Sequence, residues 1–130
     1  MLFRSDGTRI VFSSARDGPF NLYQKLSSGA GNEEALLKSD QAKYAHDWSR
    51  DGRFIVYSSA DPKTNLDLWV LPMSGDRKPA PYLQTEFDET QGQFSPDGRW
   101  MAYISNESGR TQVYVQPFPE IGRASCRERV

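Results

Sequence analysis

The sequence is poor in the residues from which metal and catalytic sites are commonly built. Its 130 residues include a single histidine, His46, and a single cysteine, Cys126. A structural zinc ion needs about four protein ligands, mostly nitrogen and sulfur atoms, and this chain offers too few of them. The Gly-x-Ser-x-Gly, His-Glu-x-x-His and Walker-type motifs are also absent from it. We therefore expect no catalytic residue, no metal ligand, no cofactor and no enzyme activity in this chain.

The sequence also lacks an excess of one charge sign, and it lacks long apolar runs. The chain has 16 Lys and Arg residues against 17 Asp and Glu residues, which gives a net charge of −1. Since it has no basic stripe, we expect no nucleic-acid partner. It contains no apolar run long enough to cross a bilayer and no secretory signal sequence. Direct insertion into a membrane is therefore not expected.

The sequence does contain a threefold internal repeat. Asp-Gly pairs at Asp6-Gly7, Asp51-Gly52 and Asp97-Gly98 are spaced 45 and 46 residues apart. Each pair lies between two aromatic residues, and an aliphatic–aromatic pair follows further along each copy. These positions are Phe3, Trp48 and Phe94, then Phe12, Tyr57 and Tyr103, then Leu22-Tyr23, Leu68-Trp69 and Val113-Tyr114. A repeat of this length indicates the architecture before any single residue is considered.

The middle copy predicts four antiparallel strands. The run after its Asp-Gly turn is almost continuously apolar, which is typical of a strand buried on both faces. Asp and Gly at its corner, preceded by Pro96 in the third copy, favour a tight turn in which Gly takes the left-handed conformation. The predicted strands are 43–49, 53–59, 66–72 and 80–85, with a polar loop at 60–65. In the first copy, residues 32–38 contain helix formers, but their place in the repeat predicts an outer edge strand.

A four-stranded unit of this length is typical of one blade of a β-propeller. The predicted fold class is therefore all-β, a partial propeller of about two and a half four-stranded antiparallel blades. The units are approximately 1–42, 43–88 and 89–119 within a propeller segment 1–119. Closed propellers have roughly four to eight blades. We therefore expect the rest of the propeller in a longer parent chain, and apolar blade faces that are open at both ends of this one.

The segment 120–130, EIGRASCRERV, breaks the repeat and shows no strand alternation. It matches, codon by codon, the in-frame translation of a common sequencing-adapter oligonucleotide. We therefore expect this tail to be foreign to the natural protein, which removes Cys126 and the three tail arginines from functional consideration. The alternative is a genuine basic tail.

The candidate contact residues lie where one blade leads into the next. Such connections gather at the mouth of a propeller channel, where partners commonly bind. The candidates for partner-facing positions are Asp40, Tyr44, His46, Glu86, Asp88 and Glu89. The alternatives for the carboxylates are a solvated loop, which the residues favour, and a weak cation site. For His46 the favoured alternative is a packed or channel-facing side chain. The repeated Asp-Gly carboxylates belong to different blades, so we expect them to shape turns and not to converge on one site.

The segments WSRDGRFIVYSS and FSPDGRWMAYIS closely resemble the repeat signature of TolB-like propellers. The resemblance extends from Phe3 to Pro119, with Phe3-Arg4-Ser5 departing from the usual Trp-Ser-Pro. The segments DLWVLPMSGDRKPAPYLQTEFDE and SNESGRTQVYVQPFP are similar to propellers at the C-terminus of large bacterial proteins, often serine/threonine kinases. This resemblance implies a bacterial, periplasmic or extracytoplasmic sensing or binding domain, without catalytic residues of its own.

Three functions are compatible with these observations. The first is a non-catalytic scaffold that binds a protein or peptide. The second is the gating propeller of a prolyl-oligopeptidase-like serine peptidase, whose hydrolase domain would carry Gly-x-Ser-x-Gly. The third, a propeller with its own active site such as a lactonase, needs convergent metal ligands that these copies do not supply. We expect the first.

Overall fold

The computed structural model describes residues 2–3, 7–16, 18–63, 65–118 and 128–129 of the chain. In these residues every regular element is a β-strand, and the strands form three four-stranded antiparallel sheets. The strands are β1 (Leu2–Phe3), β2 (Arg9–Ser14), β3 (Asn21–Leu26), β4 (Glu34–Leu37), β5 (Lys43–Trp48), β6 (Phe54–Asp61), β7 (Asn65–Pro72), β8 (Ala80–Leu83), β9 (Glu89–Phe94), β10 (Trp100–Ser105), β11 (Gln112–Pro117) and β12 (Glu128–Arg129).

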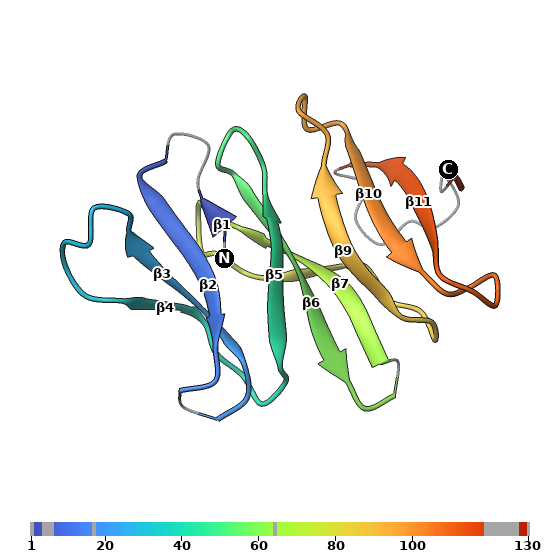
Figure 1. Ribbon diagram of the computed structural model, residues 1–130, viewed down its shortest axis with the longest axis horizontal. Coiled ribbons are helices and arrows are strands. Elements are labelled where there is room, and N and C mark those ends of the chain that lie inside the picture. Colours follow the sequence, from blue (N-terminus) through green and yellow to red (C-terminus); the bar gives the residue numbers. More distant parts are fainter. Residues whose placement is uncertain (1, 4–6, 17, 64, 119–127, 130) are drawn as a thin grey trace.

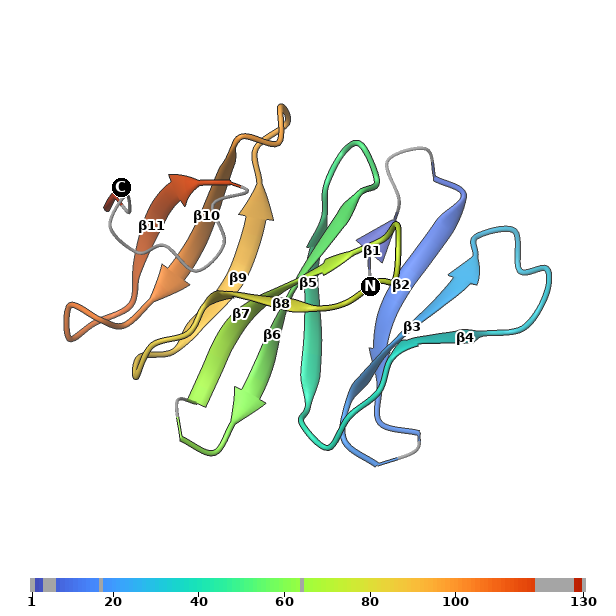
Figure 2. The same ribbon diagram turned by 180° about the vertical axis from the view of Figure 1, so that it is seen from behind.

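Each sheet is one blade of a partial β-propeller, as the repeat predicted. The blades have the strand orders β1-β2-β3-β4, β5-β6-β7-β8 and β9-β10-β11-β12, and they stand side by side (Figures 1 and 2). The edge strand predicted at 32–38 is confirmed at Glu34–Leu37, because pairing with β3 outweighs the helix propensity of its residues.

Two details of the sequence prediction were wrong. The loop expected at 60–65 is shorter, because β6 and β7 remain paired as far as Asp61 and Asn65. The tail also contributes a strand, since Glu128 and Arg129 pair with Val115 and Tyr114 of β11. The third blade therefore has four strands, not the expected three. Tail residues 120–127 and 130, Cys126 among them, lie outside the described residues.

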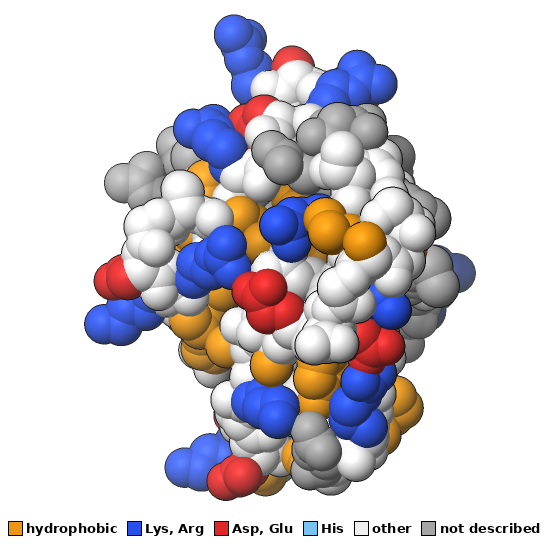
Figure 3. Space-filling model, turned by 90° about the vertical axis from the view of Figure 1, so that its left-hand side faces the viewer, with side chains coloured by type: hydrophobic (Ala, Val, Ile, Leu, Met, Phe, Trp, Pro, Cys, Tyr) orange, Lys and Arg blue, Asp and Glu red, His pale blue; other side chains and the backbone are white. Residues whose placement is uncertain are grey.

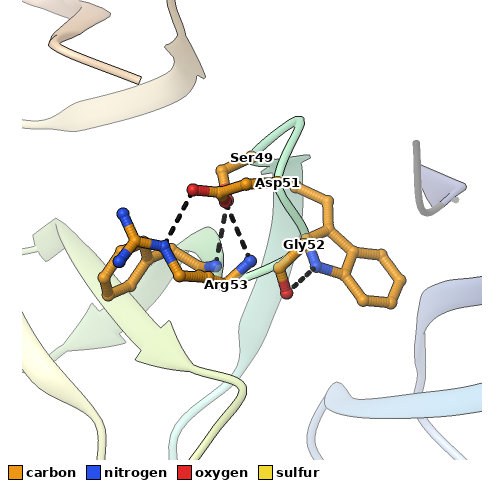
Figure 4. Close-up of polar contacts among 6 residues, drawn as sticks. Ser49, Asp51, Gly52 and Arg53 are labelled. Carbon is orange, nitrogen blue, oxygen red and sulfur yellow. Dashed lines mark hydrogen bonds and ion pairs between the residues drawn. The ribbon is translucent and has the colours of Figure 1, made fainter. Parts of the chain in front are cut away.

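The Asp-Gly turns are closed by the same hydrogen bonds in the second and third blades. Asp51 Oδ1 accepts from Ser49 Oγ at 2.7 Å and from the Arg53 amide at 3.0 Å (Figure 4). Gly52 adopts φ 77°, the left-handed conformation that was predicted. The indole Nε1 of Trp48 donates to Gly52 O at 3.0 Å, which ties the aromatic before the turn to the turn itself.

The third turn repeats this arrangement around a second carboxylate. Asp97 Oδ1 accepts from Ser95 Oγ at 2.6 Å and from the Arg99 amide at 3.0 Å. The hydrogen bond from the Arg53 amide is the main cause that lowers the pKa of Asp51, and the bond from Ser49 is the next. The bond from Ser95 is the main cause that lowers the pKa of Asp97, and the bond from the Arg99 amide is the next. Both carboxylates therefore serve their own turns, as expected.

Two apolar cores fill the spaces between blades. The first joins Val11 and Leu22 of the first blade to Trp48, Ile55, Tyr57 and Leu71 of the second. The second core joins side chains of the second blade to side chains of the third. It contains Val56, Leu68, Val70, Tyr82, Leu83, Met101, Tyr103, Tyr114 and Phe118. Successive residues of β6 thus enter different cores, which explains why its sequence is apolar without alternation.

The serine after the second aromatic of the repeat adds a polar link at each interface. Ser13 Oγ accepts a hydrogen bond from the Ala45 amide at 3.1 Å, across the first interface. At the second interface Ser58 Oγ donates to the carbonyl of Glu89 at 3.2 Å. The third copy has Ile104 at this position. The repeated serine therefore joins one blade to the innermost strand of the next.

A β-bulge interrupts the innermost strand of the second and third blades at equivalent places. On β5 the register shifts between Ala45 and Asp47, which leaves His46 as the extra residue. On β9, Gln91 and Gly92 together oppose Tyr103, and Gln91 has φ 55°. Such bulges redirect side chains along a strand.

We expect Gly92→Ala to destabilise the interface between the second and third blades. A Cβ atom at position 92 would lie 2.9 Å from Val56 Cγ2 and 3.3 Å from Met101 Sδ. Relief of such overpacking typically costs about 1–3 kcal/mol of unfolding free energy, measurable by urea denaturation. Val56→Ala removes the nearest atoms, so the double variant should lose less stability than the two single losses combined. Strictly additive losses would contradict this packing.

Candidate functional site

The connections between strands divide the molecule into two edges. The β2–β3, β4–β5 and β6–β7 connections lie at the bottom of Figure 1, and the β8–β9 and β10–β11 connections lie at the corresponding end of the tilted third blade. We call this end of the blades the loop edge. The β5–β6 and β9–β10 Asp-Gly turns lie at the opposite, turn edge (Figures 1 and 2). The candidate contact residues from the sequence belong to the loop edge or to the innermost strands that begin there.

An exposed aromatic pair lies at the loop edge of the first interface. Tyr44, at the start of β5, is 38% exposed, and Phe20, in the β2–β3 connection, is 40% exposed. Their ring centroids are 5.4 Å apart. The Lys43 amide donates to Phe20 O at 2.8 Å, which joins the two segments through their backbones. Asp40, in the same β4–β5 connection, is exposed, so an anionic side chain belongs to this part of the edge.

Lys43 is a buried residue that holds this part of the loop edge in place through hydrogen bonds. Its Nζ donates to Asn21 Oδ1 at 3.0 Å and to Gln41 O at 2.5 Å. Burial lowers the pKa of Lys43, and the negative charge of Asp40 opposes that shift. A cleft of about 170 Å³ beside it is lined in part by Gln41, Lys43 and Trp69. The ammonium group thus fixes the β4–β5 connection against the first residue of β3.

Asp88, in the β8–β9 connection, is bonded to the start of β7 and to the β10–β11 connection. Its Oδ1 accepts from the Leu66 amide at 3.1 Å, and its own amide donates to Asn106 Oδ1 at 3.0 Å. Asp88 therefore holds the β8–β9 connection to segments of the second and third blades. Glu86 in the same connection is exposed. Glu89 is 0% exposed, and Thr85 Oγ1 donates to its Oε1, so its carboxylate serves the interior.

His46 is half-buried between the second and third blades. Its Nε2 lies 2.6 Å from Ser58 Oγ and 3.3 Å from Thr90 Oγ1. Burial lowers the pKa of His46 from 6.5 to about 4, so the imidazole is neutral near pH 7. The structure therefore places His46 in a packed hydroxyl-lined position, which was the alternative to a partner-facing role.

The neighbouring Asp47, which the sequence did not single out, links two innermost strands. Its Oδ2 accepts from the Phe94 amide of β9 at 2.8 Å, and its Oδ1 from the Trp48 amide at 2.9 Å. The third copy has Gln93 at the equivalent position. Asp47 could not be recognised from the repeat, because the third copy has no carboxylate at the equivalent position. Phe20 was also missed, since only its Gly18-Pro19 context marked it as part of a loop.

The Asp-Gly turns of the second and third blades border two shared clefts. One cleft of about 220 Å³ is lined by both Asp51 and Asp97, and an adjoining one of about 270 Å³ by Asp47 and Phe94. Arg50 lines both clefts. Each of these carboxylates nevertheless accepts hydrogen bonds within its own turn.

Within the described ranges, no three histidine, cysteine or carboxylate side chains come together in a way that could hold a metal ion. The same part of the chain contains no helix that is long and apolar enough to cross a membrane.

Known proteins match this chain mainly through its fold. No protein-family model matches the sequence. An uncharacterized protein of Agrobacterium fabrum is 23% identical in an alignment of 94 residues that covers 68% of this chain and 30% of that protein. A structure assigned to TolB of Agrobacterium tumefaciens superimposes with a TM-score of 0.86 at 22% identity, over 98% of this chain and 44% of that one. TolB from Acinetobacter baumannii gives a TM-score of 0.81 at 17% identity, over 98% and 31%.

Propellers of peptidases are similar at a lower level. A prolyl endopeptidase structure matches with a TM-score of 0.71 at 12% identity, over 99% of this chain and 21% of that chain. The chain thus spans less than half the length of each of these proteins. At these identities the comparisons show the fold, and that fold is the TolB-like β-propeller.

We expect Asp47→Ala to loosen the second interface. The change leaves the Phe94 amide without its acceptor, which typically costs about 1–3 kcal/mol of unfolding free energy. Asp47→Asn retains one acceptor oxygen and should lower the unfolding free energy by less than Asp47→Ala does. Gln93→Ala is the matched control, because Gln93 is the exposed equivalent on the third blade. Urea denaturation checks the order, and equal effects of Asp47→Ala and Gln93→Ala would contradict the assigned role.

We expect the single imidazole to titrate at about pH 4, as its lowered pKa indicates. NMR of the His46 ring measures this directly, because no other histidine is present. Since the unfolded imidazole has a pKa of about 6.5, its contribution to stability is complete above that pH and falls as the pH drops toward 4. His46→Gln should remove this part of the pH dependence. A titration midpoint near 6.5 would show that the ring is not buried.

Proposed function

We propose that this chain, which has the fold of TolB-like β-propellers, is a non-catalytic binding module that holds a protein or peptide at its loop edge. The contact surface consists of Phe20, Asp40, Tyr44, Glu86 and Asp88. It excludes two of the residues singled out from the sequence, because Glu89 is buried and His46 is packed against two hydroxyl groups.

The observation that supports this proposal best is the Phe20–Tyr44 pair. Large aromatic side chains normally bury much of their area, yet these two are 40% and 38% exposed at one place. Exposed aromatic anchors of this kind are enriched among the residues that dominate binding energy in protein interfaces. The two rings come from different blades and rest on the backbone contact between Lys43 and Phe20, so they are held before a partner arrives.

The charges of the loop edge indicate the chemistry of the partner. Asp40, in the β4–β5 connection that leads to Tyr44, is an exposed carboxylate, and so is Glu86 in the β8–β9 connection of the same edge, while the cation Lys43 is buried and bonded to Asn21 and Gln41. A peptide that combines an apolar or aromatic residue with a basic one complements this surface. Such a partner needs no chemistry from the module, in keeping with the lack of catalytic motifs.

A second candidate is the gating propeller of a prolyl-oligopeptidase-like serine peptidase. It is favoured by the fold similarity to prolyl endopeptidases, at a TM-score of 0.71. The two proposals differ in the parent sequence. A downstream Gly-x-Ser-x-Gly motif, with its histidine and acidic partners, would support the peptidase. An upstream kinase domain would instead support the binding module. The resemblance to the C-terminal propellers of bacterial serine/threonine kinases stays a prediction.

Selection from a random-peptide phage library on the immobilised 130-residue chain tests the binding module. We expect enriched peptides with basic and aromatic residues, and at least about tenfold weaker binding to Tyr44→Ala and to Phe20→Ala. Arg99→Ala, at the exposed turn edge, is the control and should bind like the unaltered chain. Peptides that are lost with Arg99→Ala but not with Tyr44→Ala would move the binding site to the other edge.

A further inference from the structure

The first and second blades leave a cleft of about 170 Å³ between them. It is bounded by β4 and the β4–β5 connection on one side and by β5, β6 and β7 on the other. Both walls belong to four-stranded blades of this chain. The residues that line it include Leu37, Gln41, Lys43, Tyr57, Trp69 and Pro79.

Lys43 places a buried positive charge at this cleft. The residue is 3% exposed, and its Nζ donates to two neutral oxygen atoms, Asn21 Oδ1 and Gln41 O. An ammonium group has three N–H donors, so within the described part of the chain one of them is left for a further acceptor. Burial lowers the pKa of Lys43, and the charge of Asp40 opposes the shift, as expected of a cation held by neutral oxygens. A bound anion would balance this charge.

A second donor and apolar side chains complete the lining of the cleft. Tyr57 is 2% exposed, and burial raises its pKa, so its phenol is neutral near pH 7 and can donate a hydrogen bond. Leu37 and Trp69 pack against the first core and are both half-buried. A few polar groups on largely apolar walls are typical of sites that bind small ligands.

The second interface provides an internal comparison for this cleft. Leu83 occupies the position of Leu37 there, and it is only 3% exposed. Tyr114 occupies the position of Trp69, and it is only 6% exposed. The position of the ammonium group is taken by Glu89. The half-buried apolar lining and the cation therefore occur together at the first interface, and the general geometry of stacked blades does not produce either of them.

We propose that this cleft binds a carboxylate group that is attached to a small apolar body, such as one aromatic ring. The carboxylate accepts from the third N–H of Lys43 and from the Tyr57 hydroxyl, and the apolar body lies against Leu37 and Trp69. An apolar cavity of about 150 Å³ is large enough to bind benzene, so a cleft of this size has room for one ring. A phosphate dianion is a poorer match, because the lining supplies one cation and largely apolar walls.

Cations outside the cleft favour the approach of an anion. Lys78 is exposed and adjoins the lining residue Pro79 in sequence. Figure 3, which shows the side of the molecule formed by the first blade, has Lys and Arg side chains interspersed with apolar ones. Positive charges of this kind raise the local concentration of anions, and they offset the negative charge of Asp40 in the β4–β5 connection.

NMR spectroscopy of the 130-residue chain tests the proposal, with phenylacetate as the probe. The chain has three tryptophans, and we expect the indole N–H signal of Trp69 to shift more on titration than the other two. Phenylacetamide, which lacks the negative charge, should bind at least about tenfold more weakly. Lys43→Met should weaken phenylacetate binding by at least about tenfold as well. Lys63→Met, which removes an exposed lysine, is the matched control and should bind like the unaltered chain.

Leu37→Trp is a second variant, which fills the cleft and keeps the ammonium group of Lys43. It should block phenylacetate binding, while circular dichroism verifies that the variant keeps its β-structure. This variant keeps the proposal falsifiable if Lys43→Met does not fold, because Lys43 also fixes the β4–β5 connection.

Two further comparisons identify the source of the carboxylate and separate this proposal from the proposed function. A tetrapeptide that ends in phenylalanine is compared with its C-terminal amide. If the peptide acid binds more tightly than phenylacetate and the amide does not bind, the carboxylate is that of a chain terminus; otherwise it is that of a free acid. Tyr44→Ala should keep phenylacetate binding while it loses the peptides of the loop edge. Equal binding of phenylacetate and phenylacetamide, or an unmoved Trp69 signal at millimolar phenylacetate, would overturn the proposal.

Discussion

The structure depends on the need of each blade to bury both faces of its sheet. In the second blade, Ile55 and Val56 are adjacent in sequence and both 0% exposed, but they belong to different cores. An isolated antiparallel sheet commonly leaves one face to water, and its strands then alternate between apolar and polar residues. Here alternation is replaced by continuous apolar strands, so each blade is stabilised by its neighbours more than by its own pairing.

This stacking also determines where function can reside. The faces of the sheets are committed to packing, and the carboxylates of the Asp-Gly turns to closing their own hairpins. The side chains of the loop edge are required neither for packing between sheets nor for closing the Asp-Gly hairpins. Lys43 and Asp88 fix its backbone through hydrogen bonds between connections, while Phe20 and Tyr44 remain exposed. A rigid frame that presents adaptable side chains on its loops is a common arrangement for binding.

Much of this architecture follows from the sequence, because the repeat reports one position three times. The left-handed glycine of the turns and the edge strand at Glu34–Leu37 were both predictable from their place in the register. The bulge at His46 and the link from Asp47 to Phe94 were not, because neither depends on local sequence. They arise where two blades meet, and Asp47 has no equivalent carboxylate in the third copy. The strand at Glu128–Arg129 was missed for a related reason, since it forms by pairing with β11 and not through a pattern of its own.

Amide hydrogen exchange of the chain in its monomeric form tests the dependence on stacking most directly. If blades are stabilised chiefly by covered faces, the amides of β6 and β7 should exchange slowest, because the second blade alone has a neighbour on each side. The amides of β2 and β10 should open at lower free energy, although their strands are paired in the same way. Equal protection of all three blades, or slowest exchange in the third, would contradict the account.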